Sequence, residues 1–427
     1  MLHKVDTKRS YRQGSSNVST PEAQPNPSSF QRLAASNLSA HAAQQVGMAA
    51  APIIAVTVLG SGVGQTAWIQ LGQMLPFLLF SIPAGVLADR LPVKVLMISG
   101  EALRAVSLLC VPFIALAGLF NVPVLALLGL AGSMGSLAYS VAIPSLTRSM
   151  VQRDALPAAN GRLELVRSIA FIGGPALAGM LIASTGIDAA FGLAALLSLL
   201  AIYLLRGIAE PERGQTEARH FFVELSEGAG FAFKHPLLGS AFRLSVLYNT
   251  AFFILQTVFI PYAAGRLGMS AADIGITLSF YGIGMVLCGL FIPTFVRRLS
   301  MGQMLVVGCV TGLLASMAML VTLWHPARPF AMLCFFLLGG GPVLWTVSFT
   351  TLRQIVTPAA MLGRATSVNS LATYGARPLG AAAAGVIGSA FGMTACLVSV
   401  TALFAVQAVM LLLSPLPYLK AEELRSQ

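Results

Sequence analysis

The chain carries a long succession of apolar runs, and each run is long enough to cross a bilayer as a helix. A transmembrane helix needs about 20 mostly apolar residues, and runs of that length recur over most of the sequence. Twelve are predicted, at residues 36–59, 65–88, 94–118, 122–146, 160–184, 187–207, 237–262, 270–296, 301–324, 328–350, 363–389 and 391–414. We therefore predict an all-α integral membrane protein with twelve transmembrane helices.

Composition supports a membrane protein and argues against a nucleic-acid-binding one. Of 427 residues, 56% are hydrophobic and only 10% are charged, which is far from a soluble domain. The net charge is +11, but the basic residues are spread between apolar runs instead of forming a patch. We expect lipid and a small molecule as partners, no nucleic acid, and a monomer. The five cysteines lie singly in apolar runs, which predicts neither disulfides nor a metal site.

The distribution of basic residues predicts the orientation. An even number of spans puts both termini on one side, and nineteen of the 26 Lys and Arg residues lie on that side, against two in the opposite loops. By the positive-inside rule both termini are cytoplasmic. The expected parts are a disordered cytoplasmic tail (1–30), a six-helix bundle (31–208), a cytoplasmic linker with an amphipathic helix (209–236), a second six-helix bundle (237–415) and a tail (416–427).

The two halves of the sequence echo each other. The run Asp89-Arg90-Leu91, followed by Gly100, corresponds to Arg297-Arg298-Leu299, followed at the same distance by Gly308. A parallel repeat of six helices predicts two pseudo-symmetric bundles with a ligand held between them near mid-membrane.

A charged cluster stands between the second and third apolar runs. Its key residues are Gly85, Asp89, Arg90 and Lys94. The cluster resembles motif A of major facilitator superfamily transporters, which implies that Gly85 lets helices two and eleven approach and that Asp89 meets the positive N-terminus of helix eleven to lock a cytoplasmic gate. Pro92 and Val93 depart from that motif, so the loop geometry is expected to differ. The alternative is an ordinary basic membrane loop.

A second motif lies in the fifth run. Its members are Gly161, Gly174, Pro175 and Gly179. They resemble motif C of the same superfamily, which implies an exporter that exchanges its substrate against protons. Small residues at this spacing allow close helix packing, and the Gly-Pro step bends the helix. The alternative is a generic packing face.

Further segments refine the resemblance to one branch of the superfamily. Pro144-Ser145-Leu146 and Arg377-Pro378-Leu379-Gly380 are similar to the branch of the enterobactin exporter and macrolide efflux pumps, of the transmembrane secretion effector type. This resemblance implies export of a bulky amphipathic molecule, with siderophores and drugs as the main classes.

In this fold, helices one, four, seven and ten line the substrate cavity. Applied here, the resemblance selects His41, Gln45, Tyr139, Tyr248, Asn249, Phe253, Gln256 and Trp345. Aromatic rings with a few amides suit a ligand that has both ring and polar surfaces. The alternative is that these side chains pack between helices. No basic residue dedicated to an anionic ligand is evident among them.

Proton exchange requires an ionisable group at membrane depth. The ionisable residues near membrane depth are His41, Glu101 with Arg104, Glu164 with Arg167, and Arg377. The coupling candidates among them are His41, Glu101, Arg104 and Glu164. His41 has a reference pKa near 6.5, which suits a proton carrier. Two acid–base pairs have i, i+3 spacing, Glu101 with Arg104 and Glu164 with Arg167. The two charges of each pair can neutralise each other on one helix face. For Glu101 and Arg104 a structural role as a buried pair supporting the gate is favoured over proton relay.

The combined interpretation is a secondary transporter that exports a small amphipathic molecule by proton antiport and without a cofactor. A siderophore is the first substrate class that it predicts. The alternatives are a multidrug or macrolide efflux pump and a lysophospholipid transporter of the same fold. A membrane-embedded enzyme is disfavoured because the chain has neither an H-E-x-x-H nor a G-x-S-x-G motif.

Overall fold

The computed structural model describes residues 27–80, 83–84, 87, 91–152, 155–208, 230, 234–358 and 361–419. Within these residues the chain forms eleven α-helices and one short 3-10 helix. They are α1 (Pro27–Thr57), α2 (Val63–Leu79), α4 (Val93–Leu116), α5 (Val122–Met150), α6 (Leu156–Ser184), α7 (Ile187–Arg206), α9 (Pro236–Gly265), α10 (Ala271–Arg298), α11 (Met301–Val321), α12 (Arg328–Val356), α13 (Leu362–Leu412) and η3 (Leu416–Tyr418).

Most of these helices follow the predicted apolar runs closely, but α2 ends at Leu79, whereas its run was predicted to extend to residue 88. Three other places are informative. The first helix begins at Pro27, inside the predicted tail of residues 1–30, whose first 26 residues lie outside the described part of the chain. The predicted amphipathic linker helix also lies almost entirely outside it. The last two predicted runs are covered by α13, which contains one non-helical residue, Gly392, at φ 81°. This non-helical backbone, which only glycine adopts readily, divides α13 into two helical arms at Gly392.

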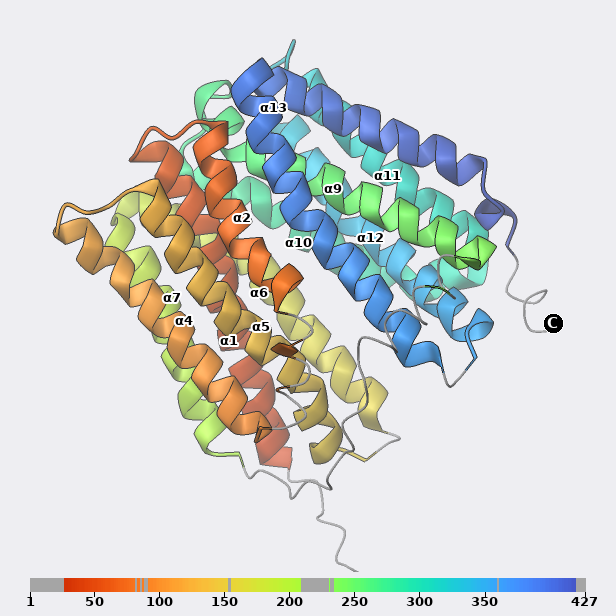
Figure 1. Ribbon diagram of the computed structural model, residues 1–427, viewed down its shortest axis with the longest axis horizontal. Coiled ribbons are helices and arrows are strands. Elements are labelled where there is room, and N and C mark those ends of the chain that lie inside the picture. Colours follow the sequence, from red (N-terminus) through yellow and green to blue (C-terminus); the bar gives the residue numbers. More distant parts are fainter. Residues whose placement is uncertain are drawn as a thin grey trace, which may run out of the picture.

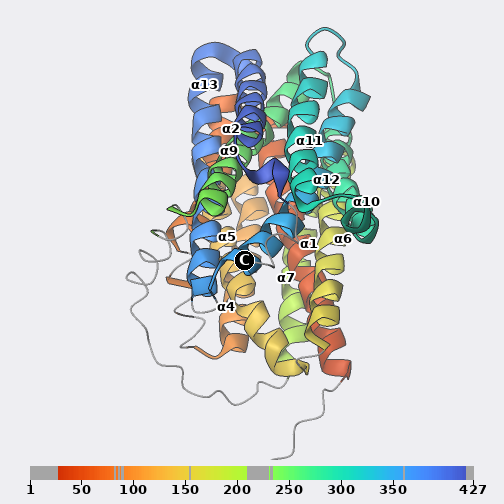
Figure 2. The same cartoon turned by 90° about the vertical axis from the view of Figure 1, so that its right-hand side faces the viewer.

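The helices are arranged in two groups that lie side by side (Figure 1). In the first group α1 packs against α6 and α7, and α4 packs against α5 and α7. In the second group α9 packs against α13, and α12 packs against both α10 and α11. The two groups meet along two helix pairs, α2 with α13 and α6 with α10. Figure 2 shows most helices close to vertical, whereas in Figure 1 α9 and α11 lie at a clear angle to α4 and α5.

Polar side chains fix several helix starts at the ends of the apolar runs. Ser270 accepts a hydrogen bond from the backbone N–H of Asp273, whose carboxylate accepts one from the Ser270 backbone. Ser300 and Gln303 form the same reciprocal arrangement at the start of α11. Such capping boxes satisfy backbone donors that the first helical turn leaves unpaired.

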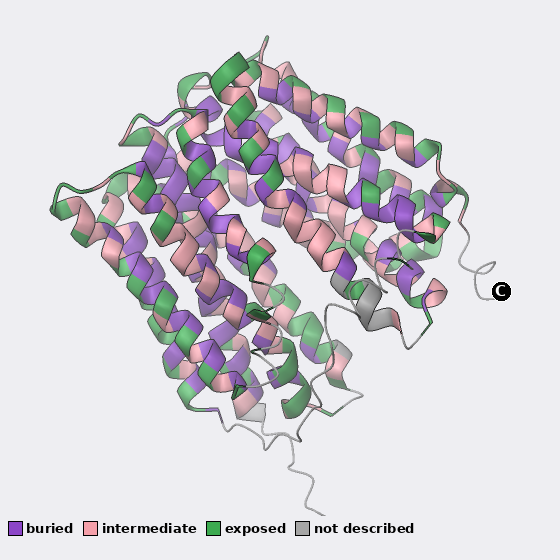
Figure 3. Cartoon of the chain, in the orientation of Figure 1, coloured by how far each residue is buried: buried purple, intermediate pink, exposed green. Residues whose placement is uncertain are grey.

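The outer surface of the two groups is apolar. Large hydrophobic side chains stay exposed on the outer faces of the helices, among them Phe113, Tyr203, Leu290 and Phe391. Figure 3 shows exposed residues along the outward faces of both groups. Within the described residues, nine helical segments are long and apolar enough to span a membrane. A continuous apolar surface on long helices is what a bilayer covers.

Glycines set how closely the two groups approach along α6 and α10. A Cβ atom on Gly179 would clash with the Ala271 carbonyl oxygen, and one on Gly275 would clash with the Pro175 carbonyl oxygen. At the other end of α6, an added Cβ on Gly161 would meet open space. A Cβ atom on Gly282 would clash with the Ile172 backbone as well, so the tight contact runs from Ile172 to Gly179 on α6 and from Ala271 to Gly282 on α10.

Candidate functional site

Polar and aromatic side chains from both groups meet near the middle of the interface. From the second group, Arg377 on α13 points its guanidinium over two rings, 4.7 Å from the Tyr374 centroid and 5.5 Å from the Phe253 centroid. Its Nε–H donates to Oδ1 of Asn249 on α9, at 3.4 Å. Arginine stacks well on aromatic faces because its planar cation is weakly hydrated. The aromatic rings therefore hold Arg377 in a defined place at the interface.

The first group contributes Arg167 on α6. Its guanidinium forms a bidentate pair with Glu164, with Nε to Oε2 at 3.0 Å, and lies 5.7 Å from the Phe171 ring centroid. Phe171 in turn contacts Tyr281 of α10, with centroids 5.9 Å apart. Arg167 and Arg377 interact electrostatically with each other and with Tyr281. Two cations from opposite groups thus face one aromatic cluster.

The two predicted residues of α1 lie in different settings. His41 is partly exposed, and the charged groups that interact with it are the guanidinium groups of Arg167 and Arg104. Gln45 is 8% exposed and packs against Gly174 of α6, where a Cβ atom would clash with it. His41 therefore interacts with a cation of α6, Arg167, and with a cation of α4, Arg104.

The remaining predicted cavity residues divide into two sets. Asn249 and Phe253 contact Arg377, as described above. Three others pack inside their own groups, where their polar atoms find partners: the Tyr139 hydroxyl bonds to Ser36, the Tyr248 hydroxyl to the Leu338 carbonyl, and the Trp345 indole to Ser245. Gln256 is partly buried, and its amide oxygen has no hydrogen-bond partner among the described residues.

Glu101 and Arg104 form an ion pair inside the first group, away from the interface. Both are buried, at 0% and 3% exposure, and Arg104 also donates to Ser198 of α7 and Ser136 of α5 at 3.1 and 2.9 Å. Gly100 on α4 faces Gly135 on α5, because a Cβ atom on either would clash with the other's carbonyl oxygen. The pair therefore joins three helices through side-chain hydrogen bonds.

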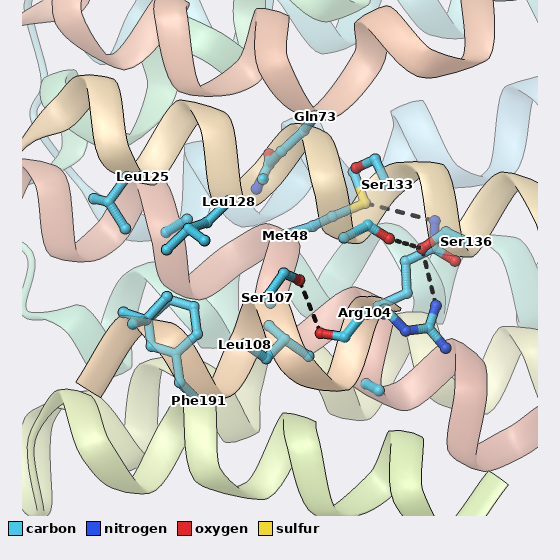
Figure 4. Close-up of a pocket in the computed structure, with 17 residues that line it drawn as sticks. Met48, Gln73, Arg104, Ser107, Leu108, Leu125, Leu128, Ser133, Ser136 and Phe191 are labelled. Atoms are coloured by element: carbon cyan, nitrogen blue, oxygen red, sulfur yellow. Dashed lines mark hydrogen bonds between the residues drawn. The ribbon is translucent and has the colours of Figure 1, made fainter. Parts of the chain in front are cut away.

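A cavity of about 40 Å³ adjoins this ion pair. Figure 4 shows Leu125, Leu128 and Phe191 at one end and Arg104 and Ser136 at the other. A volume of this size holds roughly three water molecules, which need polar partners of the kind found at the second end. The cavity lies within the first group and is too small for a bulky amphipathic ligand.

Of the predicted gate motif, Gly85, Asp89 and Arg90 lie outside the described residues. Lys94 is described, and its ammonium donates to the backbone carbonyls of Arg206 and Ile208, at 2.8 Å each. A cation at these carbonyls stabilises the negative C-terminal end of α7. The contact that the structure gives for Lys94 therefore lies within the first group.

The second motif spreads over two packing surfaces of α6. Gly174 meets α1, whereas Pro175 and Gly179 meet α10 of the other group. Gly161 lies on an exposed stretch where an added Cβ would meet nothing. Both surfaces are helix contacts, and one of them joins the two groups.

The structure changes one expectation about the site. No basic residue dedicated to an anion was evident when the cavity was chosen from helices one, four, seven and ten. Arg377 and Tyr374 lie on α13, in the eleventh predicted run (363–389), and Tyr281 lies on α10, which is the eighth predicted run (270–296), so that choice left them out. The sequence did mark Arg377 as an ionisable residue near membrane depth, and such a residue usually faces protein or an aqueous cavity. It was assigned neither to the cavity nor to proton coupling.

Comparison with known proteins identifies the fold. The family model of the Major Facilitator Superfamily matches residues 33–381. The chain belongs to this superfamily. Its relatives are transporters, and none of those compared is an enzyme. An architecture of two groups of long apolar helices agrees with this membership.

Two relatives are similar at low identity. The multidrug efflux pump Tap of Mycolicibacterium fortuitum is 27% identical over 341 residues, covering 77% of this chain and 81% of that protein. The enterobactin exporter EntS of Escherichia coli O1:K1 / APEC is 26% identical over 267 residues, and the chain spans 61% of its length. A crystal structure of a point mutant of the nucleoside transporter NupG matches 90% of this chain and 99% of its own, with a TM-score of 0.73 and 14% identity, which supports the fold alone.

Proposed function

We propose that this superfamily member exports a small amphipathic molecule across the bacterial inner membrane by exchanging it for protons. The observation that carries the proposal is the polar and aromatic cluster between the two groups, because substrates of such transporters are held between the two repeats near mid-membrane. Counting the two arms of α13 separately gives the twelve helices that this fold uses. Both termini are then cytoplasmic, and the protein acts as a monomer.

A siderophore is the first substrate class and a drug or macrolide is the second. The names of two relatives, an enterobactin exporter and a multidrug efflux pump, support these classes at low identity. The cluster favours neither over the other on shape alone, since Tyr374, Phe253 and Tyr281 offer ring surfaces to either.

For proton exchange, Glu164 is the best placed of the four predicted candidates. Its side chain is 55% exposed at the interface while it pairs with Arg167. Glu101 is enclosed between three helices, and a proton on His41 would add a third positive charge beside two guanidinium groups. A group that must exchange protons with water on both sides needs access of the kind that Glu164 has.

The test is transport in proteoliposomes with a pH gradient, acidic inside, and with ethidium and enterobactin as probes. We expect uptake of at least one probe, lost when an ionophore collapses the gradient. Glu164→Gln should reduce gradient-driven uptake more than His41→Ala does. If the gradient drives neither probe in the wild type, the antiport proposal fails; if Glu164→Gln is still fully driven, Glu164 is not the coupling group.

A further inference from the structure

The guanidinium groups at the interface point to a ligand chemistry beyond the proposed export. We propose that Arg377, with Arg167, binds an oxyanion group, a carboxylate or a phosphate, on the aromatic or amphipathic molecule that occupies the interface. The proposal rests on the interface being the substrate site, and it adds that the substrate is an organic anion.

Arg377 has hydrogen-bonding capacity that the described residues do not use. A guanidinium carries five N–H donors, and only the Nε–H of Arg377 donates to a described residue, Asn249. Within the described part of the chain no carboxylate forms an ion pair with it. A charged group at membrane depth usually pairs with another charge or faces water. An anionic ligand would supply the missing partner with a bidentate geometry that arginine favours.

Arg167 brings a second cation from the opposite group. Glu164 engages its Nε and Nη2 atoms, and Nη1 has no hydrogen bond to a described residue. Because Arg167 belongs to α6 and Arg377 to α13, an anion between them would bridge the two halves of the transporter. Such an anion would also relieve the repulsion between the two guanidinium groups.

The charge balance of the interface favours an anion. The described residues include four carboxylates: Glu101, Glu164, Asp188 and Asp273. Glu101 pairs with Arg104 inside the first group, and Asp273 pairs with Arg328 at the start of α10 and α12. Asp188 lies in the first turn of α7, which packs on α1 and α4. Among the described residues the interface thus has two guanidinium groups and one carboxylate, leaving one positive charge for a ligand.

Aromatic rings on both sides define the rest of the ligand. Phe253 and Tyr374 lie beside the Arg377 guanidinium, and Phe171 lies beside that of Arg167. Phe171 contacts Tyr281, which reaches Phe253 through the ring of Phe252. A planar group beside the oxyanion would stack on these rings. The site therefore fits an aromatic acid better than an aliphatic one.

The test is calorimetric binding to the full-length protein in nanodiscs of phosphatidylcholine, a lipid without net charge. The probes are 2-naphthoate and its uncharged isostere 2-naphthamide. We expect naphthoate to bind about 10- to 100-fold more tightly, as an added hydrogen bond to a charged group implies. Wild type that binds both equally overturns the proposal, and this comparison requires no variant.

Variants then locate the site. Arg377→Gln should remove the preference for naphthoate, and Arg377→Lys should restore part of it. The matched control is Arg328→Gln, which removes a guanidinium from an ion pair outside the cluster and should keep the preference. Gel filtration of each variant verifies folding, and Arg167→Gln replaces Arg377→Gln if that variant does not fold. If folded Arg377→Gln still prefers naphthoate over naphthamide as the wild type does, the proposal is overturned. The same outcome in Arg167→Gln overturns it where that variant is used instead.

The source of the oxyanion is decided by competition. If 1-oleoyl lysophosphatidylglycerol displaces naphthoate but lysophosphatidylcholine does not, the site also accepts a lipid headgroup; if neither displaces it, the site is for water-soluble aromatic acids. Either result supports the oxyanion site.

The anion site and proton exchange can fail separately. Charge-selective binding without gradient-driven transport would refute antiport alone. Gradient-driven ethidium uptake without charge-selective binding would refute the anion site alone.

Discussion

Two pairs of residues with the same spacing and the same chemistry lie in opposite environments. Glu101–Arg104 on α4 and Glu164–Arg167 on α6 are both i, i+3 ion pairs. The side chains of the first pair are 0% and 4% exposed, and those of the second are 55% and 39% exposed. The first pair joins three helices of one group, and the second faces the interface between groups. The same Glu–Arg spacing therefore serves packing in one place and remains available for chemistry in the other.

The physical cause of the contrast is the surroundings of each helix. Gly100 and Gly135 bring α4 and α5 together and enclose Glu101 and Arg104. On α6 the tight contacts begin further along the helix, at Phe171 and Ile172, so the Glu164–Arg167 pair before them stays open. A buried charge is costly to leave unpaired, whereas an exposed pair contributes little to stability.

The largest effect is expected from Arg104→Met. Removing the cation leaves Glu101 as an uncompensated buried charge, which should lower the free energy of unfolding by about 3–5 kcal/mol. Unfolding by SDS in mixed micelles measures the loss, and a thiol-reactive dye follows exposure of the buried Cys309, Cys334 and Cys396.

The double variant Glu101→Gln/Arg104→Met sharpens this result. It removes both charges, so most of the lost stability should return, since buried pairs often replace well with neutral groups. A double variant as unstable as Arg104→Met would show that packing, and not the unpaired charge, causes the loss.

An intermediate effect is expected from Ser136→Ala. The Ser136 hydroxyl accepts a hydrogen bond from Arg104 at 2.9 Å, and losing a bond to a charged group should cost about 1.5–3 kcal/mol. Ser140→Ala on the same helix is the control, because the Ser140 hydroxyl donates only to the Leu137 carbonyl within the described residues. Equal losses in the two variants would mean that Arg104 gains nothing from Ser136. The measurement is the same SDS unfolding.

The smallest effect on stability is expected from Glu164→Gln. This exposed pair is screened by water, so the free energy of unfolding should change by less than about 1 kcal/mol. Transport is expected to respond instead, as the proteoliposome test measures. A loss as large as that of Arg104→Met would break the distinction between the two pairs.

Much of the fold could be predicted from the sequence because apolar run length is a local property. For most helices the predicted and observed ends agree within a few residues, for example 122–146 against Val122–Met150. The i, i+3 pairing of Glu101 with Arg104 and of Glu164 with Arg167 was also predicted from spacing, and the structure forms both pairs. These features depend on residues close together in the chain.

The site was less predictable because it depends on which faces of distant helices meet. Choosing residues by helix number selected Tyr139 and Trp345, which pack inside their own groups. It left out Arg377, although an arginine within an apolar run was visible. The rotation of each helix about its own axis decides whether a polar residue points into its own bundle or toward the other bundle. These apolar helices are only weakly amphipathic, so their sequences do not specify that rotation.

The glycine contact between α6 and α10 has a mechanical consequence. In the proposed transport cycle this contact is the fulcrum of a lever, because Gly179 and Gly275 let the backbones of α6 and α10 touch there, so α10 can tilt about that point. The close contact extends to Gly282, and from there to Arg298 α10 extends about 24 Å at 1.5 Å per residue, so a tilt of about 10° around the fulcrum carries its far end about 4 Å. The N-terminal end of α10, at the glycine contact, hardly moves during such a tilt. One membrane face can therefore open while the opposite face stays sealed.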